Sequence, residues 1–223
     1  MAQQYLFGVD LGGTTVKMGL FEKDGTLLEK WEIKTRKEEN GSYILGDIAD
    51  SIKAQMEEKK LEKSDVIGVG MGVPGPVKED GTVMKCANLG WGIFNVEEEL
   101  NKLVNLKVQV GNDANVAALG EMWQGGGKGY HDMVMVTLGT GVGGGIIVNG
   151  KMVYGVHGAG GEIGHITVSA PDKHPCTCGK RGCIEQYASA NGIVRVTRER
   201  LALTDAASSL RGYEALTCKD VFY

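Results

Sequence analysis

Apolar residues recur along this chain with two different periods, and each period predicts a different kind of element. In YILGDIADSIKAQM the apolar positions are three or four residues apart, which is the spacing of one helix face and predicts a helix over Ser42–Lys60. A second helix is expected over Val96–Val104. Short segments that begin at Leu6, at Met133 and at Lys107 run into glycine-containing turns and predict strands.

Two of these segments, about half a chain apart, share one pattern. LFGVDLGGTTVKMGLFEKDG from Leu6 and MVMVTLGTGVGGGIIVNGK from Met133 both pass from an apolar strand through a Gly/Thr turn into a second strand. Nothing repeats at the shorter period of a solenoid protein, so we expect two related half-domains.

The turns of both segments are rich in glycine, a residue that occurs 35 times in the 223-residue chain. GTGVGG over Gly139–Gly144 has the letters of a dinucleotide fingerprint, but it continues as a strand instead of opening a helix. The P-loop pattern G-x-x-x-x-G-K-[ST] does not occur. Backbone amides that glycine leaves uncovered can wrap an anion. Ordinary tight hairpins are the alternative, yet two such turns, with Thr14 and Thr140 in them, favour phosphate.

Charged residues near the strand ends have more than one interpretation. Asp10 could accompany a Mg²⁺ ion on nucleotide phosphates, or it could form a turn with its own backbone. Lys17 could reach phosphate or be solvated. Asp113 follows Asn112 at a strand-to-helix corner, where it could cap the helix. Because open α/β sheets bind ligands at the carboxyl ends of their strands, we favour a functional role for this pair.

Composition and charge exclude several classes of protein. The formal net charge is −4 and the sequence pI is about 5.6, and no block of Lys and Arg supplies the positive surface that nucleic-acid binding needs. The opening MAQQYLFGVDLGG has neither the basic region of a signal peptide nor an apolar run long enough to span a membrane. We therefore expect a cytoplasmic protein.

Three of the five cysteines lie close together, as expected for a metal site in a reducing compartment. Cys176, Cys178 and Cys183 have the spacing C-x-C-x4-C, and Zn²⁺ commonly takes three cysteines and one histidine. His165 and His174 both qualify as the fourth ligand, and spacing does not separate them.

Taken together, the motifs resemble those of a known family. DLGGTTVK, GVPGPV, NLGW, GNDANVAALGE, LGTGVGGGI, GGEIGH and CTCGKRGCIE are similar in order and spacing to motifs of the ROK family of sugar kinases and repressors, most of all its bacterial ATP-dependent glucokinases. The resemblance runs from Tyr5 to at least Tyr187. It implies a duplicated α/β fold of the actin/hexokinase (ribonuclease H-like) type, with a cleft between two domains. We expect a small domain over 1–113 and a larger domain over 114–223 that is truncated at its C-terminus, because family members are longer.

The resemblance also implies a role for each motif residue. Asp113 would be the catalytic base. The substrate-binding residues would be Gly75, Asn88, Asn112, Glu162, His165 and Glu185. The nucleotide would be bound by Asp10, Gly12, Gly13, Thr14, Lys17, Thr140 and Gly141. A structural Zn²⁺ would take His165, and not His174, together with Cys176, Cys178 and Cys183.

The function implied by the resemblance is transfer of a phosphoryl group from MgATP to the terminal hydroxyl of glucose, in carbohydrate metabolism and glycolysis. Other hexoses, N-acetylmannosamine and a phosphate donor other than ATP stay open, and we expect a homodimer without nucleic-acid or membrane partners. A sugar-sensing repressor would ordinarily carry a helix-turn-helix ahead of the strand that begins at Tyr5. A non-catalytic, actin-like interaction protein would need neither the zinc loop nor the Asn112–Asp113 pair.

Overall fold

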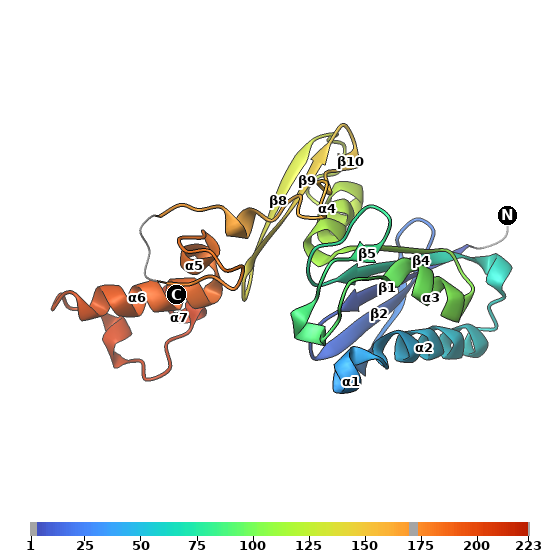
Figure 1. Ribbon diagram of the computed structural model, residues 1–223, viewed down its shortest axis with the longest axis horizontal. Coiled ribbons are helices and arrows are strands. Elements are labelled where there is room, and N and C mark those ends of the chain that lie inside the picture. Colours follow the sequence, from blue (N-terminus) through green and yellow to red (C-terminus); the bar gives the residue numbers. More distant parts are fainter. Residues whose placement is uncertain (1–3, 170–173, 223) are drawn as a thin grey trace. The chain divides into compact units, whose positions relative to one another are not determined.

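The computed structural model describes residues 4–169 and 174–222 (Figure 1). The chain divides into two compact units. The first contains the residues up to Met133 together with Ile146–Gly160, and the second contains Val134–Gly145 together with the residues from Gly161 onward. The domain boundary expected after Asp113 stays a prediction.

The first unit is built on a mixed sheet, which within the described residues has five strands in the order β3-β2-β1-β4-β7. β1–β2 and β2–β3 are antiparallel pairs, whereas β1–β4 and β4–β7 are parallel pairs. The first predicted hairpin is confirmed as β1 and β2. The strand bounds are β1 Tyr5–Leu11, β2 Thr15–Glu22, β3 Leu27–Lys34, β4 Val66–Val73 and β7 Val108–Asn112.

One face of this sheet carries the apolar core. Val9 lies opposite Met18 on β2 and Met71 on β4, and all three belong to the buried cluster. Helices α2 (Ile44–Glu58) and α3 (Val96–Val104) add their apolar faces to the same cluster. The predicted bounds of α3 are confirmed, and α2 begins at Ile44 instead of Ser42 because Tyr43 is its N-cap.

The opposite face of the sheet is lined with glycine. Gly8 lies opposite Gly19 and Gly70, and Gly72 lies opposite Gly111. Helix α4 (Asp113–Gln124) packs here, since a Cβ atom at Gly111 would lie 3.0 Å from Val116 Cγ2. The missing side chains therefore let the first turn of α4 approach the backbone of β4 and β7.

The segment from Gly72 to Gly92 lacks a clear period in sequence, and the structure divides it into short elements. β5 (Thr82–Val83) pairs with β6 (Phe94–Asn95), and the 3-10 turn η2 covers Ala87–Leu89. The remaining short elements of the first unit are α1 (Glu38–Gly41) and η1 (Lys63–Asp65).

The second predicted hairpin is confirmed as β8 (Met133–Leu138) and β9 (Val142–Val148), which lie in a sheet of order β10-β9-β8 with β10 (Lys151–Met152). The second unit continues with η3 (Ile163–His165), α5 (Glu185–Ala188), α6 (Ala190–Ala202), η4 (Ser209–Gly212) and α7 (Cys218–Phe222). Strands and helices are mixed, which confirms the α/β class. Among the described residues, no helix has the length and apolar character needed to cross a membrane.

Candidate active site and metal centre

The turn between β1 and β2 is held in place by its own backbone and by a buried threonine. Gly12 N donates to Thr15 O at 3.0 Å, and a Cβ atom at Gly12 would lie 2.8 Å from the same oxygen. Thr35 Oγ1 donates to Gly12 O at 2.7 Å and Thr35 N donates to Thr14 O at 3.0 Å. Gly12–Thr14 is therefore a fixed backbone turn at the surface, which suits an anion.

Asp10 lies inside β1, so the interpretation of this residue as a turn former is wrong. It is exposed on the glycine-lined face, opposite Lys17 on β2 and Gly72 on β4. A carboxylate and an ammonium group side by side, close to an anion-binding turn, can hold a phosphate together with its cation.

Asp113 is the first residue of α4; the residue is exposed at the surface, and its carboxylate is partly desolvated. Burial raises its pKa above the ordinary range and the charge of Asp10 adds to this effect, while the bond from Ala114 N to Asp113 Oδ1, at 2.8 Å, opposes it. A carboxylate whose ionised form is destabilised accepts a proton more readily than a carboxylate of ordinary pKa. This is the property that a general base needs.

Asn112, and not Asp113, is the N-cap of α4. Its Oδ1 accepts from Asn115 N at 3.1 Å, and its Nδ2 donates to Gly75 O at 3.0 Å. The side chain therefore ties the loop after β4 to the start of α4. Its proposed contact with a sugar stays a prediction.

Asn88 is exposed in η2, between the buried residues Cys86 and Trp91, which form an isolated bridge with each other. Burial raises the pKa of Cys86, and the charge of Asp113 contributes to this shift. The loop that carries Asn88 is thus within electrostatic reach of the Asp113 carboxylate.

The turn between β8 and β9 is closed by residues from the second unit. Gly139 N donates to Gly141 O at 3.0 Å, and Ala190 N donates to Gly139 O at 2.9 Å. Glu185 Oε2 accepts from Val142 N at 3.1 Å, and a Cβ atom at Gly141 would collide with that oxygen at 2.5 Å. Thr140 is exposed at the tip, so the turn resembles the Gly12–Thr14 turn in presenting backbone and a threonine hydroxyl.

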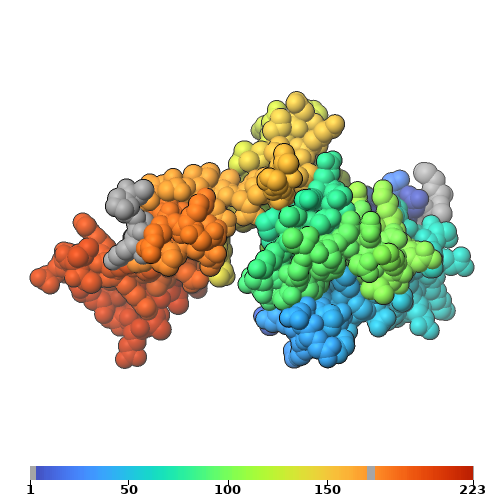
Figure 2. Space-filling model, in the orientation of Figure 1, coloured from blue at the N-terminus to red at the C-terminus, as the bar shows by residue number. Residues whose placement is uncertain are grey.

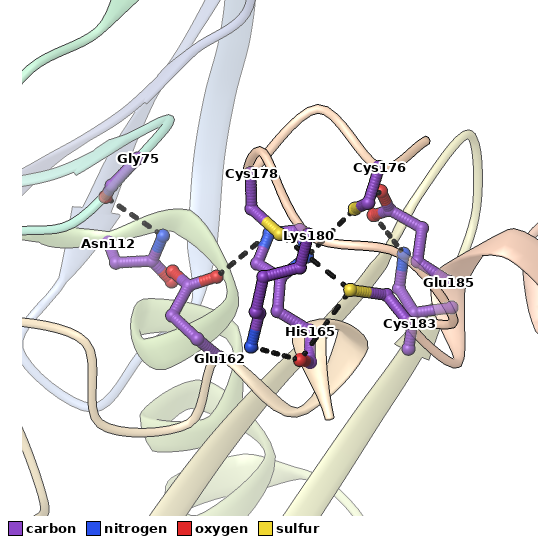
Figure 3. Close-up of polar contacts among 10 residues, drawn as sticks. Gly75, Asn112, Glu162, His165, Cys176, Cys178, Lys180, Cys183 and Glu185 are labelled. Atoms are coloured by element: carbon purple, nitrogen blue, oxygen red, sulfur yellow. Dashed lines mark hydrogen bonds and ion pairs between the residues drawn. The ribbon is translucent and has the colours of Figure 1, made fainter. Parts of the chain in front are cut away.

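The three cysteines and one histidine converge in the second unit (Figure 3). The ligand atoms of His165, Cys176, Cys178 and Cys183 all lie within 4.8 Å of one another. Cys176 Sγ is 3.4 Å from His165 Nδ1, and the sulfurs of Cys178 and Cys183 are 3.6 Å apart. Tetrahedral bonds to Zn²⁺ would separate such atoms by about 3.6 and about 3.8 Å, so the residues fit this ion.

The neighbours of the cluster distinguish the two candidate histidines. His174 Nε2 lies 2.9 Å from Glu199 Oε1. His165 instead lies among the three cysteines, and its Nε2 is 3.8 Å from Glu162 Oε2. Burial and the adjacent thiols raise the pKa of Cys183 to about 12. A bound cation would favour the thiolate instead.

The predicted site residues therefore fall into two groups, one in each unit. The first unit holds Asp10, Gly12, Gly13, Thr14, Lys17, Gly75, Asn88, Asn112 and Asp113, and the second holds Thr140, Gly141, Glu162, His165, Cys176, Cys178, Cys183 and Glu185. Sequence reasoning missed Thr35, which is 4% exposed and anchors the first turn. No local pattern marks this threonine, because its partner Gly12 is distant in sequence.

The α/β protein thus presents two glycine turns, a carboxylate of raised pKa at a helix start and a Cys3His cluster that fits a metal ion. Comparison with known proteins gives the family: the model described as "ROK family" matches residues 6–217, and the chain belongs to the ROK family.

The relatives include sugar kinases, and a xylose repressor of Caldicellulosiruptor bescii is also 31% identical over 87% of this chain. A glucokinase of Halalkalibacterium halodurans is 45% identical over 226 residues, which cover 100% of this chain and 68% of the relative. An N-acetylgalactosamine kinase of a Shewanella species is 32% identical, with 96% of this chain and 70% of the relative covered. The crystal structure of a ROK glucokinase from Streptomyces griseus with glucose and AMPPNP matches with a TM-score of 0.70 at 37% identity, covering 90% of this chain. The chain spans 62% of the length of that structure.

Proposed function

We propose that this chain provides the sugar-binding, base and phosphate-binding parts of an ATP-dependent sugar kinase, with glucose as substrate. The observation that carries the proposal is the carboxylate of Asp113 at the start of α4, whose pKa is raised by partial desolvation and by the nearby charge of Asp10, the strand residue that precedes the Gly12–Thr14 turn. The identity of 45% to a glucokinase supports glucose.

In the proposed reaction the terminal hydroxyl oxygen of the sugar attacks the γ-phosphorus of ATP. The new O–P bond forms as the bond to the bridging β,γ-oxygen breaks, ADP leaves, and Asp113 accepts the hydroxyl proton. The candidate phosphate contacts are the Gly12–Thr14 turn and Lys17 in the first unit, and Thr140 with Gly141 in the second. Mg²⁺, for which Asp10 is the candidate ligand, would offset phosphate charge. Most of the rate comes from positioning and charge stabilisation.

The sugar is held by hydrogen bonds in this proposal. Asn88 and the Gly75 loop lie in the first unit, and Glu162, His165 and Glu185 in the second are the further candidates. We assign Zn²⁺ a structural role in the Cys3His cluster, where it would orient His165. An analogue that lacks a bonded hydroxyl would leave buried polar groups unpaired, which is the physical basis of discrimination.

The test is a panel of sugars with ATP, measured as sugar-dependent formation of ADP, with NMR to identify the phosphorylated position. We expect glucose phosphorylated on its terminal hydroxyl. A preference for an N-acetylhexosamine would favour the second candidate, which the 32% identity to an N-acetylgalactosamine kinase supports. Sugar binding by calorimetry without any transfer would overturn the kinase proposal in favour of a sugar sensor.

Two further expectations belong to this proposal. Exposed apolar side chains on β8, at Val134, Val136 and Leu138, support a homodimer, which analytical ultracentrifugation tests. The cytoplasmic location expected from the sequence stays a prediction.

A further inference from the structure

The loop from Cys86 to Trp91 presents Asn88 on a closed backbone ring. Cys86 N donates to Trp91 O at 3.2 Å, and Trp91 N donates to Cys86 O at 3.0 Å. Leu89 N also donates to Cys86 O, at 3.1 Å, and the Leu89 side chain is fully buried. Asn88 is thus exposed at the tip of a loop whose base is fixed.

A strained turn lies against this loop. Glu39, Asn40 and Gly41 have φ angles of 51°, 57° and 70°, so three consecutive residues of α1 are left-handed. Left-handed backbone is unfavourable for a residue with a Cβ atom, and it persists only where the surrounding structure determines it. In Figure 2 the blue segment that contains residue 40 lies against the green segment that contains residue 90.

The two segments touch through backbone atoms and one indole. Trp91 Nε1 donates to Gly41 O at 3.1 Å in a buried hydrogen bond. A Cβ atom at Gly41 would lie 2.6 Å from Leu89 O and 2.8 Å from Trp91 Nε1. A Cβ atom at Gly90 would lie 2.8 Å from Asn40 Cα. Both glycines are therefore required by space as well as by their positive φ angles.

This contact lies near the surface of the first unit, where Asn40 and Gly90 are exposed. A surface hollow borders it, lined in part by Asn40, Gly41, Gly90 and Trp91. Beside this hollow, the Trp91–Gly41 hydrogen bond and the close backbone approach join the loop to α1.

We propose that Trp91 and Gly41 are positioning residues for the sugar: they fix the Cys86–Trp91 loop so that Asn88 is already placed when the sugar binds. This inference rests on the proposed function, because it takes Asn88 as a sugar ligand. A group held in place before binding loses less conformational freedom on binding, so the affinity depends on the contact behind it.

The first test is Trp91→Phe, which keeps an aromatic ring and removes the bond to Gly41 O. We expect the KM for the sugar to rise about three- to tenfold, the worth of one hydrogen bond, with kcat and the KM for ATP unchanged. The matched control is Trp31→Phe, which removes a comparable indole bond, from Trp31 Nε1 to Ser51 Oγ at 2.8 Å. An equal rise in both variants would show a general effect on stability and overturn the proposal.

The second test disturbs the contact from the other side. Gly41→Ala places a methyl group against Leu89 O and is expected to raise the KM for the sugar. The control is Gly46→Ala in α2, where nothing lies within 4 Å of the added Cβ atom, and it is expected to leave this KM unchanged. In a background of Asn88→Ala, Trp91→Phe should add nothing further, because both changes remove one interaction. Additive effects would contradict the proposal.

Hydrogen exchange separates this inference from the proposed function. Trp91→Phe should accelerate exchange of the Leu89 and Trp91 amides, while Asn88→Ala should not. If the protein phosphorylates no sugar, the proposed function fails, and the exchange rates still decide whether Trp91 holds the loop. Unchanged exchange in Trp91→Phe would overturn the positioning role even in an active kinase.

Discussion

Asp113 combines two requirements that oppose each other at the scale of a single residue. Its carboxylate has to be ionised to accept a proton, yet burial and Asp10 disfavour the charge. In the unfolded chain the same carboxyl group has an ordinary pKa. Between the two pKa values the folded state binds more protons, so the free energy of unfolding falls as the pH rises through that window and stays lower above it.

The first prediction follows for Asp113→Asn. Turnover should fall by about 10²–10⁴-fold, the usual contribution of a general base. The free energy of unfolding at neutral pH should increase, because the change removes a partly desolvated charge that lies near Asp10. Steady-state kinetics and urea unfolding measure the two effects.

Asp80→Asn is the matched control for this change. The hydrogen bond from the Thr82 backbone lowers the pKa of Asp80. Removing this carboxylate should therefore decrease the free energy of unfolding at neutral pH, the opposite of the change expected for Asp113→Asn, and leave turnover unchanged. Retained turnover in Asp113→Asn would mean that this carboxylate only supports the start of α4.

The second prediction concerns the pH profile. Because the pKa of Asp113 is raised, the acidic limb of kcat/KM for the sugar should lie above the ordinary aspartate value of about 3.9. Activity should be lost as the pH falls through the raised pKa. An acidic limb at or below the ordinary value would contradict the assignment of Asp113 as the base.

At the scale of elements, the cysteine loop and the β8–β9 turn are joined through one side chain. Glu185 begins α5, its Oε2 accepts from Val142 N in the hairpin, and its Oε1 lies 3.9 Å from Cys176 Sγ. The short helix α5 therefore connects the metal centre to the second candidate phosphate turn. Loss of the metal is expected to disturb both.

The third prediction is that the protein binds one Zn²⁺ ion per chain and that Cys176→Ser releases it. Metal binding supplies folding energy to a loop with few other contacts, so the variant should also melt at a lower temperature. Elemental analysis and calorimetry measure these outcomes. Cys218→Ser, in α7 outside the cluster, is the control that should keep the metal. Wild-type protein prepared without chelators and free of zinc would contradict the assignment.

At the scale of the whole molecule, the two units differ in what holds them together. The apolar cluster of the first unit runs from Phe7 to Val110 and joins strands with helices. Among the described residues of the second unit, the buried apolar residues are few, and two of them, Cys176 and Cys183, are candidate metal ligands. A metal ion held by these residues would take the place of a large core there.

The fourth prediction uses the position of the three tryptophans, Trp31, Trp91 and Trp123, all of which lie in the first unit. Chelation of zinc should lower the unfolding temperature detected by far-UV circular dichroism for the second unit. The unfolding temperature detected by tryptophan fluorescence, which reports on the first unit, should not change. A fluorescence transition that shifts equally would show that the two units unfold together.

Local patterns determined much of this protein. The period of apolar residues predicted α3 over Val96–Val104, and the side chain of Asn95 accepts from Glu98 N as its cap, within one turn of the chain. The two strand–turn–strand segments were predicted for the same reason, since alternation and glycine turns are short-range properties. The motif order was sufficient to predict the family, which the match over residues 6–217 confirms.

Contacts between distant residues were decided only by the tertiary structure. Spacing left His165 and His174 equivalent, and the fold brings His165 to the cysteines. Asp10 proved to lie opposite Lys17, and Asn112 proved to be the cap that also ties down Gly75. Trp91 meets Gly41 across 50 residues of sequence. A sequence pattern reports the period of one segment. Contacts between residues distant in sequence depend instead on how separate segments pack against each other, and this packing is determined by burial of the whole core.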